Sequence, residues 1–153
     1  MAGMASDADD GAAQIGQALA SGAAAERFGQ MVAAQGGPVD FPEHWERYLP
    51  VAPVQRDIFP DTAGTVAAID TRAVGLAVVA LGGGRRREGD RIDPRVGFTH
   101  LAAPGDQVGA AHPIGRVHAA DEDSAESAAA ALRAACHIGP GTPRGPLVLG
   151  RIT

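Results

Sequence analysis

The sequence predicts an α/β fold of the α+β type: short N-terminal helices followed by a mixed, mostly antiparallel sheet or sandwich with two packed helices. Apolar residues recur at helical spacing within the first 50 residues. From Val51 onward, short β-branched runs are bounded by proline and glycine, as is typical of strands. Hydrophobic residues make up 45% of the chain but aromatic residues only 4%, so the core must consist of alanine, valine, isoleucine and leucine.

The 153 residues suit one domain, or one domain with a helical appendage, and we divide them into a helical segment, 1–50, and an α/β domain, 51–153. The helical segment begins with two short helices, whose apolar residues fall at i, i+3 and i+4 (Ile15, Ala18, Leu19) and at equivalent positions (Phe28, Met31, Val32). Ser21 is the expected cap of the second helix. Asp40 is the expected N-cap of a third helix, with Pro42 in its first turn.

In the α/β domain, the pattern predicts alternating strands and helices. Strands are expected at 51–59, joined by a turn to Gly64–Ile69, and again at 96–101, 113–118 and 147–152. One helix should start at Asp70 or Thr71 and end at three glycines, Gly82 to Gly84. An alanine-rich helix should begin near Asp123, three residues before Glu126, and run to about His137.

Charge and composition exclude several classes of function. The net charge of −5 and pI near 5.4 argue against binding to nucleic acid or to an anionic membrane. No apolar stretch approaches the length of a membrane span, and the acidic N-terminus lacks the features of a signal peptide. A single cysteine, Cys136, fits a reducing compartment, so we expect a cytoplasmic protein. All 13 basic residues are arginine, which excludes Schiff-base chemistry, a P-loop lysine and biotinyl or lipoyl carriers.

The most distinctive motif is a glycine–arginine turn that offers a weak candidate anion site at Gly83, Gly84, Arg85 and Arg86. In the usual phosphate sites, however, glycines follow a strand and open a helix, whose positive end faces the anion. Here they follow a helix, where the dipole end is negative. We therefore favour a helix cap, with the arginines paired to Glu88, Asp90, Asp93 or the last carbonyls of the helix.

No set of residues assembles into a catalytic or metal site. The five histidines lack the spacing of a zinc site, and His118 offers at most a pair with Asp121 or Glu122. His137 suits a helix C-terminus, and Cys136 is expected to be a buried small hydrophobe. We therefore predict no catalytic residue, no metal and no cofactor.

Three stretches of sequence together carry a family resemblance. They lie within residues 28–50, 64–86 and 92–122, and they include Gly37-Pro38-Val39-Asp40, then Ile69-Asp70-Thr71-Arg72 with Gly82-Gly83-Gly84-Arg85-Arg86, then Gly105-Asp106-Gln107-Val108 with His118-Ala119. In this order they resemble the C-terminal part of thymidine phosphorylase, in the family shared with pyrimidine nucleoside phosphorylase. The resemblance runs from about residue 20 to residue 153.

Members of that family use phosphate to displace the base of thymidine, giving thymine and 2-deoxyribose 1-phosphate. Their catalytic groups lie in the N-terminal two-thirds of the enzyme and include a Gly-Thr-x-Asp signature, whereas Gly64-Thr65-Val66 is followed here by Ala67. The resemblance therefore implies part of a closing lobe that is inactive alone, with phosphate as co-substrate and pyrimidine nucleoside bound only in a full-length enzyme. The alternative is a free-standing binding or regulatory module of the same fold. Because the helical segment would keep an uncovered apolar face, we also expect self-association, including a homodimer.

Overall fold

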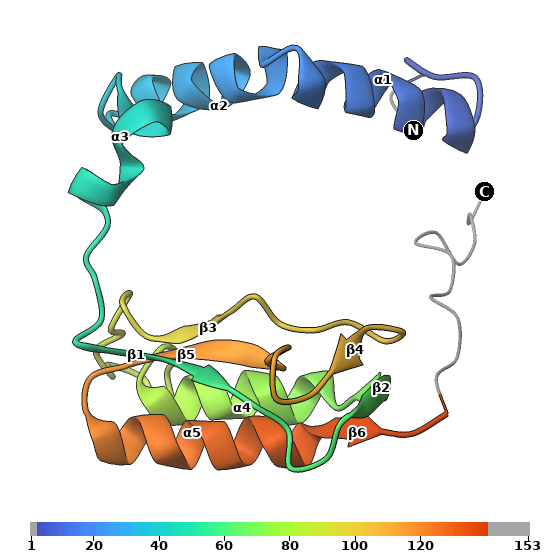
Figure 1. Ribbon diagram of the computed structural model, residues 1–153. Helices are drawn as coiled ribbons and strands as arrows, with labels where there is room; N and C mark the ends of the chain where they lie inside the picture. The colour runs from blue at the N-terminus through green and yellow to red at the C-terminus, as the bar shows by residue number, and fades with distance from the viewer. Residues whose placement is uncertain (1–2, 141–153) are drawn as a thin grey trace. The chain divides into compact units, whose positions relative to one another are not determined.

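The computed structural model describes residues 3–140 (Figure 1). The chain divides into two compact units, Met1–Pro50 and Val51–Thr153, which we call the helical unit and the α/β unit and describe separately. Among the described residues, no helix is both long and apolar enough to cross a membrane.

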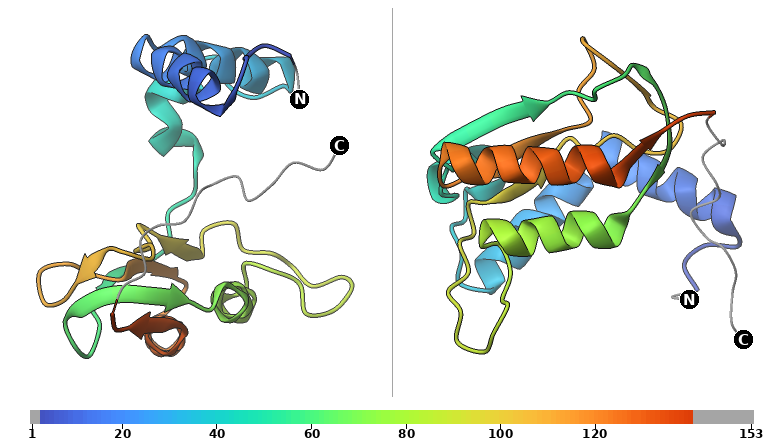
Figure 2. Two further views of the ribbon diagram at one scale, coloured as in Figure 1. Left: turned by 90° about the vertical axis from the view of Figure 1, so that its right-hand side faces the viewer. Right: turned by 90° about the horizontal axis from the view of Figure 1, so that it is seen from below.

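The helical unit consists of α1 (Ala8–Ala20), α2 (Ala23–Ala34) and α3 (Phe41–Tyr48). Helices α1 and α2 follow one another end to end, which Figures 1 and 2 show from two directions. The expected cap at Ser21 is wrong: Ser21 ends α1, and Gly22, with a φ of +82°, precedes α2 because glycine accepts the left-handed backbone needed there. Asp40 does precede α3, but its carboxylate accepts a hydrogen bond from the Tyr48 hydroxyl instead of capping the helix.

Between residues 51 and 140, the α/β unit has two antiparallel three-stranded sheets and two helices. The first sheet has the order β1 (Val54–Ile58), β5 (Gly115–Ala119), β3 (Gly97–Thr99), and the second has the order β4 (Gln107–Val108), β2 (Gly64–Ile69), β6 (Cys136–Ile138). Helices α4 (Thr71–Leu81) and α5 (Glu122–Ala135) lie side by side against the strands (Figures 1 and 2). This arrangement confirms the predicted α+β fold with two packed helices.

The core of the α/β unit lies between the strands and α5. Its largest fully buried side chains are aliphatic: Ile58, Val66, Ile114, Val117 and Leu132. Helix α5 faces them with alanines, which let the helix approach the sheet closely (Ala125, Ala128, Ala129, Ala135). Strand β5 alternates between buried and partly exposed residues, so its charged side chains point away from the core.

Several predicted boundaries are wrong because long-range pairing decides them. The two strands expected on either side of the turn after β1 are present, but they lie in different sheets, since β1 pairs with β5 and β2 pairs with β4 and β6. Helix α5 ends at Ala135, so His137 lies in β6 opposite Ala68 and not at a helix C-terminus. The strand expected at 147–152 lies outside the described residues.

Candidate functional site

The glycine–arginine turn begins as a cap on α4. Gly82 has a φ of +97°, and the Gly83 amide donates to the carbonyl of Val78 at 2.9 Å, a Schellman-type closure. A Cβ at Gly83 would lie 2.8 Å from Val78 Cγ1, and one at Gly84 would lie 2.7 Å from Val79 Cγ2. The glycines therefore allow the turn to pack back on its own helix.

The backbone amides that follow the helix cap bind the carboxylate of a residue in the same loop, Asp90. Asp90 Oδ2 accepts hydrogen bonds from the backbone amides of Arg86 at 3.0 Å and Arg87 at 2.9 Å. The Arg86 guanidinium reaches the Ala80 carbonyl near the end of α4 at 3.5 Å. A phosphate at these two amides would have to displace the Asp90 carboxylate, which is covalently tethered and already in place.

The same loop closes through a bidentate ion pair. Asp93 accepts from Arg95 Nε at 2.9 Å and from Nη2 at 2.7 Å, and the Asp93 amide donates to the carbonyl of Gly82 at 3.0 Å. The Arg95 guanidinium and amide hold the pKa of the Asp93 carboxyl down at about 2. This contact fixes the end of the loop on the α4 cap.

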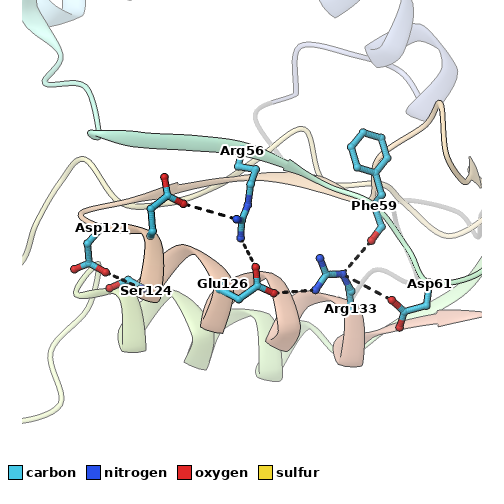
Figure 3. Close-up of polar contacts among 8 residues, drawn as sticks. Arg56, Phe59, Asp61, Asp121, Ser124, Glu126 and Arg133 are labelled. Atoms are coloured by element: carbon cyan, nitrogen blue, oxygen red, sulfur yellow. Dashed lines mark hydrogen bonds and ion pairs between the residues drawn. The ribbon is translucent and has the colours of Figure 1, made fainter.

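A second polar cluster joins α5 to β1 and to the chain that follows it (Figure 3). Arg56 Nη2 lies 2.7 Å from Glu126, whose other oxygen lies 3.5 Å from Arg133. Arg133 Nε donates to the Phe59 carbonyl at 3.1 Å. We call these three charged residues, Arg56, Glu126 and Arg133, the α5 latch, since they connect the helix to the strand along one side.

The outer face of the β1–β5–β3 sheet carries the third cluster. Arg116 on β5 makes a two-point ion pair with Asp57 on β1, at 2.7 and 3.1 Å. His118, two residues along β5, lies 2.8 Å from Thr99 Oγ1 on β3. Burial lowers the pKa of His118, and the nearby Arg116 and His100 act in the same direction, which favours the neutral ring.

The pairing of His118 with Asp121 or Glu122 is wrong. Asp121 instead caps α5 by accepting from the Ser124 amide at 2.7 Å, and Glu122 lies 3.7 Å from Arg56. Cys136 is half-buried beside the core, and burial raises the pKa of its thiol, so it is not a ready thiolate nucleophile. Within residues 3–140, no three His, Cys, Asp or Glu side chains group as metal ligands.

The three clusters can hold the fold together, because the carboxylates of Asp57, Asp90, Asp93 and Glu126 each have a partner within the chain. The α5 latch could not be found from a local pattern, because Arg56 lies 70 residues from its partner Glu126 along the chain. The ion pair between Asp57 and Arg116 could not be predicted from the sequence either, because it depends on the β1–β5 register, which places the two residues opposite each other. No nucleophile, general base and anion donor meet at one point in these clusters.

Residues 65–139 match the family described as the pyrimidine nucleoside phosphorylase C-terminal domain. The matched segment begins within β2, contains α4 and α5, and ends just after β6. Strand β1 lies outside it, although its five residues pair along β5 and contact α5. The α/β unit of this chain therefore contains a pyrimidine nucleoside phosphorylase C-terminal domain, extended at its N-terminal side by β1.

Proposed function

We propose that this domain belongs to the closing lobe of a thymidine phosphorylase-like enzyme and is inactive alone. In that reaction a phosphate oxygen bonds to the anomeric carbon of thymidine as the bond to the base breaks. The products are thymine and 2-deoxyribose 1-phosphate. The observation that carries the proposal is the family match over residues 65–139.

The geometry supports a role as a rigid body. The transition state of such a displacement resembles an oxocarbenium ion, and it needs phosphate-binding groups and groups that stabilise the leaving base. Several charged residues of the α/β unit are instead engaged with one another, as in the pairs Asp57–Arg116 and Asp93–Arg95. A lobe that closes over a reaction site must move as one piece, and such cross-links favour that behaviour.

An assay of thymidine phosphorolysis tests the proposal. Thymine release in phosphate buffer is measured for this chain alone, for the N-terminal catalytic portion of a pyrimidine nucleoside phosphorylase alone, and for the two mixed. We expect turnover well above either component only in the mixture. Turnover by this chain alone would overturn the claim that it is inactive, and an inactive mixture would favour the free-standing binding module.

The glycine–arginine turn requires a separate control, because a phosphate site there would change the role of the domain. Phosphate is titrated into the chain by calorimetry, with Arg85→Ala and Arg86→Ala as comparison variants. Since Asp90 already occupies the amides of Arg86 and Arg87, we expect no saturable heat at millimolar phosphate. Saturable binding that both variants lose would assign the turn a direct part in holding phosphate.

A further inference from the structure

A cavity of about 370 Å³ lies between helices α4 and α5, which run side by side (Figure 2). We call it the α4–α5 groove, and all of its lining residues belong to the α/β unit. Its floor is apolar, since Ala77 of α4 and Ala128 of α5 line it and are only 6% and 5% exposed. Because alanine side chains end at Cβ, the two helices leave this space unfilled. Its volume lies within the range of about 300–1,000 Å³ that is typical of sites for small organic molecules.

Three polar side chains of the α4–α5 groove are left largely unpaired within residues 3–140. Arg56, Arg95, Arg116 and Arg133 form ion pairs there. Arg86 forms none, and its guanidinium makes only a long hydrogen bond of 3.5 Å to the Ala80 carbonyl. The Ser127 hydroxyl and the Asp123 carboxylate line the same groove and have no hydrogen bond or ion pair in this part of the chain. All three side chains are exposed, so a ligand would replace water around them.

The chemistry of these groups describes the ligand that they would recognise. Arg86 presents a planar fork of N–H donors, which suits the paired oxygens of a phosphate or carboxylate. The Ser127 hydroxyl can donate to the same anion or accept from a neighbouring group. Ionised Asp123 only accepts hydrogen bonds, so it repels a bare anion and requires an N–H or O–H from the ligand. The alanine floor, finally, suits an apolar or flat ring.

The backbone amides near the α4–α5 groove are already engaged. Those of Arg86 and Arg87 donate to Asp90, and the amide of Ser124 at the start of α5 donates to Asp121. An anion in the groove would therefore be held by the Arg86 guanidinium and not by a glycine loop or a helix N-terminus. Inorganic phosphate alone would leave the apolar floor uncovered, so it is a poor ligand for this site.

We propose that the α4–α5 groove binds a nucleoside monophosphate. Its phosphate would pair with Arg86, its sugar hydroxyls would donate to Asp123, and its base would cover the alanine floor. Such a ligand supplies the anion, the donors and the flat ring in one molecule of the size that the cavity accepts. The inference goes beyond the proposed function and does not depend on it, because the groove lies within the α/β unit and no catalytic portion is needed to form it.

Calorimetry on the full chain with three related ligands tests which parts of the ligand are recognised. We expect uridine 5′-monophosphate to bind saturably, with half-saturation below about 1 mM. Uridine lacks the anion that pairs with Arg86, and ribose 5-phosphate lacks the ring that covers the alanine floor. Each should bind at least about tenfold more weakly. Inorganic phosphate should compete with uridine 5′-monophosphate only at much higher concentration.

Two pairs of variants locate the binding at the α4–α5 groove. Arg86→Gln removes the guanidinium, whereas Arg87→Gln removes the same charge from the next residue, which does not line the groove. Ser127→Leu places a bulky side chain in the groove, whereas Ala130→Leu adds one at another exposed position of α5 outside it. We expect Arg86→Gln and Ser127→Leu to weaken binding of uridine 5′-monophosphate at least about tenfold, and each control less than about twofold. Circular dichroism and thermal unfolding select variants that keep the wild-type fold.

The remaining outcomes contradict the inference. No saturable binding of uridine 5′-monophosphate by the wild-type chain overturns it. Equal binding of uridine or of ribose 5-phosphate shows that the anion or the ring is not recognised, and it overturns the assigned ligand class. Equal effects of each variant and its control place the binding elsewhere on the chain and overturn the site. None of these results bears on the proposed function, because phosphorolysis is measured separately.

Discussion

Gly82 ends α4 with a φ of +97°, a backbone conformation that strains residues with a side chain. A Cβ there would meet no atom within 4 Å, so Gly82→Ala reports on backbone strain alone. We expect it to lower the free energy of unfolding by about 1–2 kcal/mol. Gly75, exposed inside α4, has equal room, and Gly75→Ala should raise that free energy by up to about 1 kcal/mol. Urea denaturation measures both, and changes of the same sign would contradict this account of the cap.

Asp93 provides a pH-dependent contact in the loop that follows. Its pKa is about 2 in the folded chain, below the ordinary value of 3.8, because the Arg95 guanidinium stabilises the charged form. A lowered pKa means that the contact stabilises the fold fully above the ordinary value and that this contribution is lost as the pH falls through about 2. An NMR titration should place the Asp93 midpoint near 2, and Arg95→Gln should move it up toward 3.8.

The matched control for that titration is Arg91→Gln, which removes one positive charge from the same loop without touching the bidentate pair. It should leave the Asp93 midpoint close to that of the wild type. A wild-type midpoint near the ordinary value, or equal effects of Arg91→Gln and Arg95→Gln, would show that the loop does not hold this geometry in solution.

At the scale of the element, α5 is fixed to the sheet by its apolar side far more than by the α5 latch. Leu132 is 1% exposed within the core, so Leu132→Ala should lower the free energy of unfolding by about 2–5 kcal/mol. The Glu126 side chain is 62% exposed, and exposed ion pairs contribute little, so Glu126→Gln should lower it by less than about 1 kcal/mol. Thermal and urea unfolding compare the two, and a larger loss in Glu126→Gln would reverse this ranking.

The helices with strong local signals were predictable from the sequence. The sequence left the cap of α4 open between Asp70 and Thr71, and it is Asp70 that accepts from the Ala73 amide, at 2.9 Å. The start of α5 was placed two residues late, because the capping pair is Asp121 with Ser124 and not Asp123 with Glu126. Such caps depend on neighbours within four residues, which is why a local pattern can find them.

Two short strands, β4 and β6, were not predicted, because they form only through pairing with a distant strand. Strand β4 has two residues and exists because Gly64 and Thr65 pair with it, more than 40 residues away in the chain. Strand β6 follows α5 without a breaker residue, and its pairing with β2 ends the helix. The hydrogen bonds from the backbone amides of Arg86 and Arg87 to the Asp90 carboxylate also depend on the path of the loop. Residue spacing alone does not predict them.

At the scale of the whole molecule, the two units differ in their charge balance and in how far their apolar side chains are buried. The α/β unit encloses a core of its own and balances eleven acidic residues with eleven arginines. The helical unit carries the entire net charge, and four apolar side chains of α1 and α2 are exposed: Ile15, Leu19, Phe28 and Met31. The α/β unit therefore has a buried core of its own, whereas the exposed apolar side chains of the helical unit can be buried only against another surface.

That contrast predicts how the free chain behaves in solution. Attraction between the exposed apolar side chains of α1 and α2 in different copies favours self-association, and repulsion between helical units of charge −5 opposes it. Screening shortens the range of repulsion, so the chain should be mainly monomeric at about 20 mM salt and associate at about 0.5 M. Sedimentation velocity at the two salt concentrations measures this, and Ile15→Asp should abolish the high-salt species while Gln17→Asp retains it. Association that weakens with salt, or that both variants lose equally, would show that the contact is electrostatic or lies elsewhere on the chain.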